Sequence, residues 1–150
     1  MSEFMHKKIL PNDILLSEVS RLVAEGEKVT LMTKGQSMLP FIRGGKDSVV
    51  LERPDELRKG MIVLAEISEG VYVLHRITDM KADRVKLMGD GNIKGYECCA
   101  VTDVKAVATA ILRNEKSIDC NGRKHRRLAA IWSCVLPVRR WLLAIYRRIF

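Results

Sequence analysis

Aromatic residues are scarce in this sequence, and no apolar run is long enough to cross a membrane. Aromatic residues make up 5% of the 150 positions, so a surface for stacking nucleic-acid bases is not expected. The longest uncharged stretch, residues 128–138, has 11 residues and contains Pro137, whereas a membrane-spanning helix needs about 18 apolar residues or more. The first residues also lack the apolar segment of a secretory signal, so we expect no export by that route.

The sequence also lacks the spacings that mark metal sites and disulfide frameworks. Its four cysteines include no C-x-x-C pair, and the neighbours Cys98 and Cys99 are poorly placed to bridge each other. Three scattered histidines, at positions 6, 75 and 125, do not complete a cluster of zinc ligands. We therefore expect no metal and no cofactor, and we expect reduced cysteines in a cytoplasmic protein.

Acidic residues are missing from the C-terminal part of the chain. Apolar residues make up 47% and charged residues 29%, as in an ordinary globular protein, and the net charge is +8. Residues 120–150 carry eight Lys and Arg and no Asp or Glu, whereas the cations and acids of residues 1–119 cancel. A basic tail on a neutral body favours an anionic partner.

Hydrophobic spacing predicts one helix followed by many short strands. Apolar residues recur at helical spacing over residues 12–25, where Asn12 or Asp13 can cap the helix. From residue 28 the period changes to two, and strands are expected over 29–33, 48–52, 61–67, 71–78, 84–88, 101–112 and 117–120. The short turns between them indicate a mainly β fold with an antiparallel coiled sheet or partial barrel. We expect an N-terminal helix (1–27) packed on a β domain (28–120), and then a helical tail (121–150).

One glycine-containing loop directly after a predicted strand carries the strongest candidate for chemistry. Gly35 permits a tight turn, Pro40 stiffens its exit, and Ser37 lies between them. A nucleophilic serine needs a rigid turn that presents its Oγ beside free backbone N–H groups. A serine in such a turn is common in proteins, however, so this loop alone does not select catalysis.

Four segments, in the same order along the chain, resemble the motifs of the signal peptidase I and LexA-like serine peptidases. Residues 35–40 (G-Q-S-M-L-P) resemble the nucleophile box, and residues 58–65 (R-K-G-M-I-V-L-A) a strand start. Residues 72–77 (Y-V-L-H-R-I) are similar to the strand that bears the base, and residues 86–92 (K-L-M-G-D-G-N) to the G-D-x-N turn. The match covers roughly residues 28–112, and it implies the coiled β fold of this superfamily.

The resemblance implies a role for each matching residue. Ser37 corresponds to the nucleophile, and His75 stands where bacterial members carry a lysine base, as in endoplasmic-reticulum signal peptidases. The substitution is chemically sensible because a neutral imidazole can accept the serine proton near pH 7. Gly35, Met38 and Pro40 are expected to border the substrate groove.

The acid that orients the base is less well defined. Asp90 matches the acid of the G-D-x-N turn, and we favour it as the partner of His75. Endoplasmic-reticulum enzymes usually have a second Asp a few residues later, and here Glu97 is the alternative. Gly35 replaces the serine that helps to form the oxyanion hole in signal peptidases, so the expected donor is the Ser37 backbone N–H with a second group that the sequence does not identify.

The residues after Pro137 have the pattern of a helix that lies at a membrane surface. At 100° per residue, four arginines (139, 140, 147 and 148) fall on one half of this helix, and five apolar or aromatic residues (141, 142, 145, 146 and 149) on the other. This pattern favours binding to an anionic membrane. Packing on its own domain or on a second copy is the alternative, and nucleic-acid binding is disfavoured by the apolar face.

The sequence therefore predicts a serine endopeptidase that cleaves a peptide or precursor protein, peripheral on the inner face of the cytoplasmic membrane. One alternative is a non-catalytic peptide-binding or membrane-associated module of the same fold. The other is a self-cleaving regulator of the LexA type, although about 27 N-terminal residues are too few for a helix-turn-helix domain. Neither the substrate nor the oligomeric state is specified by the sequence.

Overall fold

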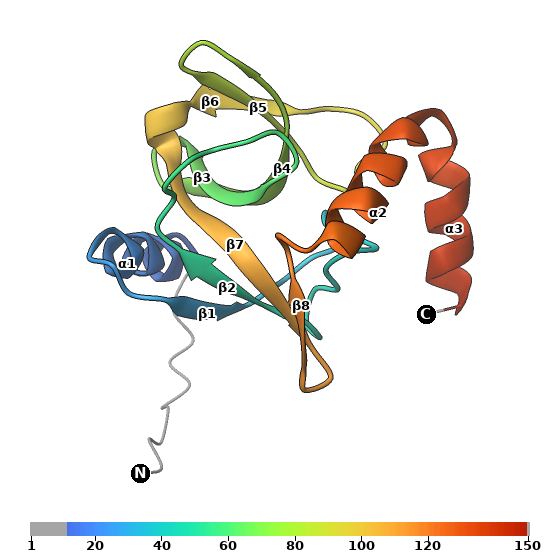
Figure 1. Cartoon of the computed structure of the whole chain (residues 1–150), viewed down its shortest axis with the longest axis horizontal. Coiled ribbons are helices and arrows are strands. Elements are labelled where there is room, and N and C mark those ends of the chain that lie inside the picture. The colour runs from blue at the N-terminus through green and yellow to red at the C-terminus, as the bar shows by residue number, and fades with distance from the viewer. Residues whose placement is uncertain (1–11, 150) are drawn as a thin grey trace.

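The computed structural model describes residues 12–149, which form three α-helices, eight strands and two short 3-10 helices (Figure 1). In chain order the elements are α1 (Asn12–Ala24), β1 (Val29–Met32), β2 (Ser48–Glu52), β3 (Ile62–Ser68), β4 (Val71–Lys81), β5 (Arg84–Met88), β6 (Glu97–Ala100), η1 (Val101–Asp103), β7 (Val104–Arg113), β8 (Lys116–Asp119), α2 (Arg123–Cys134), η2 (Leu136–Val138) and α3 (Arg139–Ile149).

All of the strand pairs are antiparallel and belong to one sheet. The strand order is β1-β2-β7-β3-β4-β5-β6, with β8 paired to β7. The predicted antiparallel sheet and N-terminal helix are confirmed, but the sheet is open and is not curled into a barrel: within residues 12–149, β1 and β6 lie at its two ends and do not pair. The sequence also did not predict β6, whose four residues are too short to show a period.

The first hydrophobic cluster joins α1 to one face of the sheet. Val19 and Val23 of α1 are buried against Leu51 of β2, Leu64 of β3 and Ile42 of the loop between β1 and β2. Gly26, with a φ of +94°, follows α1 in the left-handed conformation that commonly ends a helix. The helix therefore covers the face on which the Ser37 loop also packs.

The second cluster lies on the opposite face of β3. Successive residues of β3 alternate between the clusters, with Ile62 and Leu64 in the first and Val63 and Ala65 in the second. Because β3 and β4 are in register, the same alternation applies along β4. His75 lies opposite Val63, and the next residue lies opposite Ile62, so the two point to different faces.

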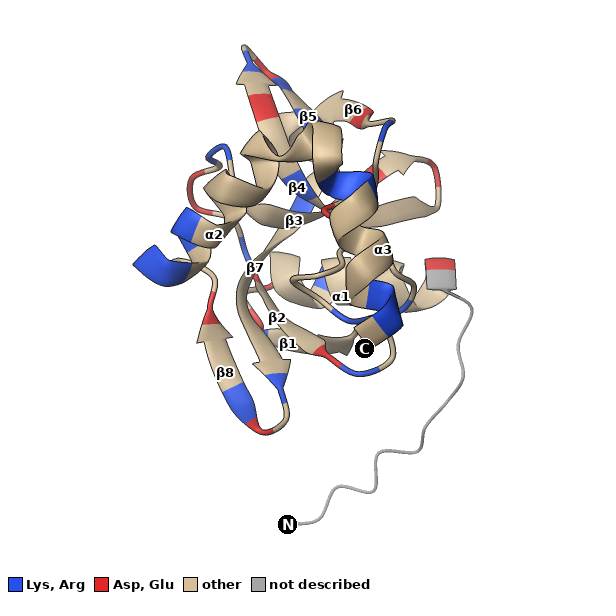
Figure 2. Cartoon of the chain, turned by 90° about the vertical axis from the view of Figure 1, so that its right-hand side faces the viewer, with Lys and Arg blue, Asp and Glu red and all other residues tan. Residues whose placement is uncertain are grey.

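The C-terminal segment is helical and breaks at Pro137, as predicted. Helices α2 and α3 are bent by 70° relative to each other and lie together at one side of the sheet (Figures 1 and 2). Trp132 of α2 donates a hydrogen bond from Nε1 to the Asp90 carbonyl oxygen at 2.7 Å, and His125 packs edge-on against Phe41. These contacts attach α2 to the loops beside Ser37.

One residue of α3 departs from the expected helix pattern. The sequence places Arg139 among the four arginines expected to face an anionic membrane, but it is 5% exposed and lies over the Trp132 ring. Its guanidinium donates to the carbonyl oxygens of Asn92 and Trp132 at 3.0 and 3.2 Å. Arg139 therefore anchors the start of α3, because two backbone carbonyl oxygens accept hydrogen bonds from its terminal nitrogens, whereas its buried Nε has no partner within residues 12–149.

The outward side of α3 remains apolar and exposed. Trp141, Leu142, Ile145 and Ile149 form a stripe at helical spacing and are between 39% and 68% exposed, whereas Leu143 is buried. No single helix within residues 12–149 is long and apolar enough to span a membrane, although α2 and the segment from Leu136 together reach that length and composition as a bent pair.

Candidate active site

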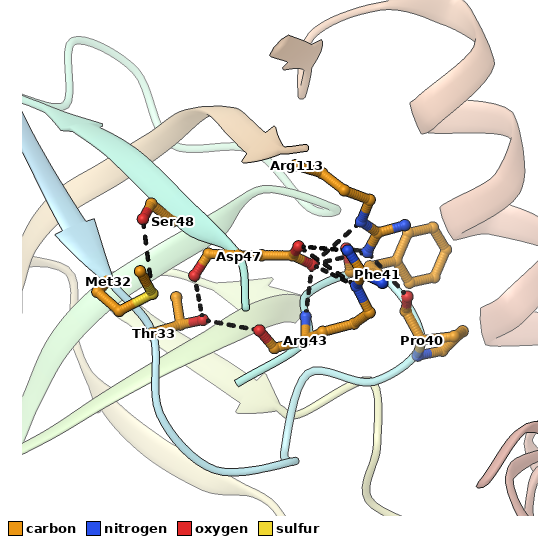
Figure 3. Close-up of polar contacts among 8 residues, drawn as sticks. All are labelled: Met32, Thr33, Pro40, Phe41, Arg43, Asp47, Ser48 and Arg113. Carbon is orange, nitrogen blue, oxygen red and sulfur yellow. Dashed lines mark hydrogen bonds and ion pairs between the residues drawn. The ribbon is translucent and has the colours of Figure 1, made fainter. Parts of the chain in front are cut away.

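Ser37 lies in the loop between β1 and β2. One buried residue, Asp47, holds that loop through its backbone carbonyl oxygen and its carboxylate (Figure 3). Thr33 donates to the Asp47 carbonyl oxygen from its backbone N–H at 3.1 Å and from its Oγ1 at 2.8 Å. The Asp47 carboxylate accepts from the Arg43 backbone N–H at 2.7 Å and from Arg113 of β7 at 2.8 Å. Arg113 also donates to the Phe41 carbonyl oxygen, so the loop is fixed to the sheet at several points.

Asp47 has no exposed surface, and its charge is balanced by two arginines. Burial by itself raises the pKa of the Asp47 carboxyl, but the hydrogen bonds from Arg113 and Arg43 outweigh it and hold that pKa below its usual value. Asp47 therefore remains ionised and keeps the loop rigid, as the turn of a nucleophile requires.

Glycines let the Ser37 turn approach its neighbours closely. A Cβ at Gly44 would overlap the backbone of Gly35, and one at Gly91 would overlap the Gln36 carbonyl oxygen. The Gly91 backbone N–H also donates to the Ser37 carbonyl oxygen at 2.7 Å. The turn after β5 thus supports the Ser37 turn through close backbone contacts and through a hydrogen bond from the Asp90 N–H to Met38 Sδ at 3.5 Å.

Ser37 and His75, which lie on different elements, line the same cavity. This cavity, of about 230 Å³, is bordered by Ser37 from the loop and by His75 from β4. Gly35 and Met38 also line it, as predicted for substrate contacts, although Met38 is 4% exposed and belongs to the first cluster as well. Pro40 is not among the lining residues; its carbonyl oxygen faces Arg113.

The imidazole of His75 is held by Glu97. Its Nδ1 lies 3.0 Å from Oε2 of Glu97, the first residue of β6, and His75 is 6% exposed. A carboxylate accepts the Nδ1–H, which leaves the lone pair of the neutral ring on Nε2. Within residues 12–149 no hydrogen bond joins His75 to Ser37, so Nε2 is not engaged by the serine in this structure.

Asp90, the acid favoured from the sequence, is bound elsewhere. Arg76 donates to both carboxylate oxygens of Asp90, at 2.8 and 2.7 Å, and both side chains are buried. His75 and Arg76 are neighbours on β4 and point to opposite faces, so an acid that binds Arg76 bidentately lies away from the His75 ring. The preference for Asp90 over Glu97 as the His75 partner was therefore wrong.

Two backbone donors near the serine are unoccupied. The N–H groups of Ser37 and Met38 donate no hydrogen bond within residues 12–149, whereas the next N–H, that of Leu39, donates to the Gln36 carbonyl oxygen. Free N–H groups at a nucleophile are the donors that an oxyanion requires. The Met38 N–H is therefore the candidate for the second donor, which the sequence does not identify.

One side of β4 is open beside the cavity. Strand β3 pairs with β4 from Val71 to Arg76, but β5 pairs with it only from Arg76 onward. Val73 and Leu74 line the cavity in this stretch, which has β3 on one side and no strand on the other. An unpaired strand edge can add an extended peptide through main-chain hydrogen bonds.

Sequence reasoning missed the residues that support the site. Arg76 received no role, yet it carries Asp90 and donates to the Gly60 carbonyl oxygen at 2.8 Å. Asp47 and Arg113 were also not singled out. The alternation of His75 and Arg76 along a strand was a usable signal, because two such neighbours need partners on two faces.

The cysteines and the possible metal ligands are weaker candidates for a functional site than Ser37 and His75. Of the four free cysteines, Cys99 is buried, and burial raises the pKa of the Cys120 thiol to about 11, so that thiol stays protonated. Within residues 12–149 no group of three or more His, Cys, Asp or Glu residues is arranged to hold a metal ion.

No protein-family model matches this chain, and no curated protein matches its sequence at a significant level.

Proposed function

We propose that this protein is a serine endopeptidase that cleaves a peptide or precursor protein through a Ser37–His75 pair. The observation that carries the proposal is that Ser37 and His75 line one cavity while Glu97 holds the far nitrogen of the imidazole. A nucleophile, a base and an orienting acid are the groups that serine acyl transfer needs. The signal-peptidase-like motifs around these residues support the same reaction.

The reaction follows from the atoms at the cavity. Nε2 of His75 takes the proton from the Ser37 Oγ as the oxygen attacks the scissile carbonyl carbon, and it returns that proton to the leaving amine. The N–H groups of Ser37 and Met38 donate to the oxyanion. Water then hydrolyses the acyl-enzyme with His75 as base again. Glu97 stabilises the imidazolium, the role that the sequence analysis assigned to Asp90.

An extended peptide is the substrate geometry that the site favours. Tyr72, Val73 and Leu74 of β4 line the cavity and have no strand on the side away from β3, so main-chain hydrogen bonds along that edge would align a peptide past Ser37. Side chains of the peptide would enter the cavity, whose walls include Leu64, Tyr72 and Leu74. The pocket is small and mainly apolar at this point, which favours small apolar residues next to the cut.

Active-site labelling tests the proposal. A fluorophosphonate probe, which reacts with activated serines, should label the full chain at Ser37, as located by mass spectrometry. Ser37→Ala should abolish labelling, and His75→Ala should slow it by at least about 10²-fold, because the base is lost. Ser20→Ala is a matched control, since Ser20 lies on α1 with its Oγ bound to the Leu16 carbonyl oxygen, and it should label like the parent.

Two outcomes would contradict the proposal, one by excluding catalysis and the other by assigning self-cleavage. A folded chain whose Ser37 is never labelled would assign the non-catalytic module, which the missing Ser37–His75 hydrogen bond favours as the second candidate. Apo sites are often looser than the Michaelis complex, so this missing bond alone does not decide. Loss of intact mass on incubation of the purified chain would instead assign a self-cleaving regulator of the LexA type.

We further propose that the enzyme works at an anionic membrane surface on the cytoplasmic side. The stripe of Trp141, Leu142, Ile145 and Ile149 on α3 is uncovered within residues 12–149. Exposed arginines at 140, 147 and 148 on the same helix supply the charge that anionic headgroups attract. An apolar stripe flanked by cations is the composition of a helix that lies in the headgroup region.

A further inference from the structure

A second and larger cavity lies between α2 and the sheet. Its volume is about 1100 Å³, and its walls come from α2, from β4 and β5, and from residues 58–62 and 93–96. Ser37, His75 and Glu97 do not line it. This cavity, called the α2 groove below, is therefore separate from the proposed cleavage site.

The charge of the α2 groove is of one sign. Nine Lys and Arg residues line it and no Asp or Glu does. Six of the nine are exposed and make no side-chain ion pair or hydrogen bond within residues 12–149, namely Arg58, Lys59, Lys94, Arg123, Arg126 and Arg127. The whole chain has 18 Asp and Glu residues, so the lack of acidic side chains in the lining distinguishes this groove from the rest of the protein. Apart from Arg76, which the buried Asp90 neutralises, the lining cations thus give the groove a positive potential.

Between these cations the wall is apolar. Met61, Ile77 and Met88 line the groove from the sheet, and Ile77 is 1% exposed. At the rim, Ile93 and Leu136 are 44% and 39% exposed. Leu136 begins η2, the short segment that leads into α3, so the apolar rim continues toward the exposed stripe of that helix. Open apolar surface of this extent commonly marks a binding site.

We propose that the α2 groove binds an anionic amphiphile, that is, an alkyl chain with a phosphate or carboxylate headgroup. The chain would lie on the apolar wall and the headgroup among the exposed cations. A nucleotide fits less well, because Tyr96 is the one Phe, Tyr or Trp residue in the described lining, and Lys86 Nζ already lies over its ring at 4.0 Å. A peptide strand fits less well too, because β4 and β5 are paired with each other here and offer no free edge.

Binding of defined amphiphiles to the full chain tests this inference without any reference to catalysis. Dodecyl phosphate and dodecanoate, each kept below its micelle concentration, should bind saturably with one molecule per chain in isothermal titration calorimetry. Decyl phosphate should bind roughly tenfold more weakly than dodecyl phosphate, since each buried CH₂ contributes a factor of about three to four. Dodecyl maltoside tests the contribution of the alkyl chain without the charge, and inorganic phosphate tests the contribution of the charge without the alkyl chain.

Charge reversal locates the site. Arg126→Glu with Arg127→Glu should weaken dodecyl phosphate binding by about tenfold or more, because both exposed guanidinium groups line the groove. Arg147→Glu with Arg148→Glu makes the same change of net charge on α3, outside the groove, and should leave the affinity within about twofold. Ala130→Trp, which fills the groove from α2, should weaken binding as well. Circular dichroism and thermal melting confirm that each variant is folded.

The possible results separate cleanly. Preference for the phosphate would assign a phospholipid and preference for the carboxylate a fatty acid, and either supports the proposal. Three results would overturn the proposal. The first is binding of dodecyl maltoside as tight as that of dodecyl phosphate, and the second is the same loss of affinity in both double variants. The third is binding of the acidic peptide hexaglutamate but not of dodecyl phosphate. Because calorimetry does not need an active Ser37, failure here leaves the peptidase proposal standing, and failure of labelling leaves the amphiphile site standing.

Discussion

Two carboxylates near Ser37, those of Glu97 and Asp90, bind different partners. Glu97 holds His75 on one face of β4, and Asp90 neutralises Arg76 on the other. The Glu97 carboxylate is partly exposed, whereas Asp90 and Arg76 are both buried. Loss of the first carboxylate should therefore affect chemistry, and loss of the second should affect folding.

Glu97→Gln and Asp90→Asn test this division. Glu97→Gln should slow Ser37 labelling by roughly 10²-fold or more with little change in stability, because the imidazolium loses its stabilising charge. Asp90→Asn should lower the free energy of unfolding by about 3–5 kcal/mol, since it leaves the Arg76 charge buried without its partner. Labelling rates and urea unfolding measure the two effects. The opposite pattern would return Asp90 to the role that the sequence suggested.

Asp47→Asn tests the clamp on the Ser37 loop. It should cost about 2–3 kcal/mol at pH 7, somewhat less than a fully buried pair, because Arg43 and Arg113 are partly exposed. The pKa of Asp47 is depressed in the folded protein, so its stabilisation is complete above the unfolded value of about 3.9 and is lost as pH falls through the lower folded pKa. Urea unfolding from pH 2 to 7 should show a flatter acid limb for the variant. An unchanged acid limb would place the acid sensitivity in other carboxylates.

Among the elements, α2 is attached to the loop between β1 and β2 through a buried histidine. His125 is 6% exposed, and burial, followed by the charge of Arg76, lowers its pKa. The folded state therefore holds neutral His125 while the unfolded chain titrates near pH 6.5. The packing of α2 on Phe41 thus depends on pH.

His125→Gln tests this dependence. In the parent, stability should be complete above about pH 6.5 and should decline as pH falls below that value toward the lower folded pKa, because the unfolded chain binds the extra proton. In the variant, this pH-dependent part of the stability should be absent between pH 5 and 7. Thermal melts followed by fluorescence of Trp132, which neighbours Phe41, measure it. Identical slopes in the two proteins would show that His125 is accessible to protons in the folded state.

For the whole molecule, the exposed stripe of α3 predicts membrane association. Trp141→Ser with Ile145→Ser should abolish cosedimentation with vesicles that contain phosphatidylglycerol, and the free energy of unfolding should change by less than about 0.5 kcal/mol because both residues are exposed. Ile14→Ser with Val71→Ser removes equally exposed apolar residues elsewhere and should bind like the parent. Raising the salt concentration should weaken binding through screening of the arginines. Equal loss in both variants would show non-specific adsorption.

Much of the local structure could be predicted because it depends on neighbouring residues. The period of two gives β2 and β5 at the expected bounds, and the helical spacing gives α1 to within one residue. Strand β6 could not be predicted in this way, because its residues are strand-like only in their pairing with β5. The missed strand also explains the missed acid, since β6 carries Glu97 to His75.

Apart from β6, the order of the main helices and strands was determined by the sequence alone, as were the basic C-terminal helices and the candidates Ser37 and His75, because periodicity and short motifs are local properties. Tertiary structure decided which carboxylate meets the imidazole, why the sheet stays open and where the α2 groove lies. These features depend on strand register and on which face each side chain takes, and a shift of one residue reverses them. Arg139 illustrates the difference, since its helical position was predictable but its burial against Trp132 and the Asn92 carbonyl oxygen was not.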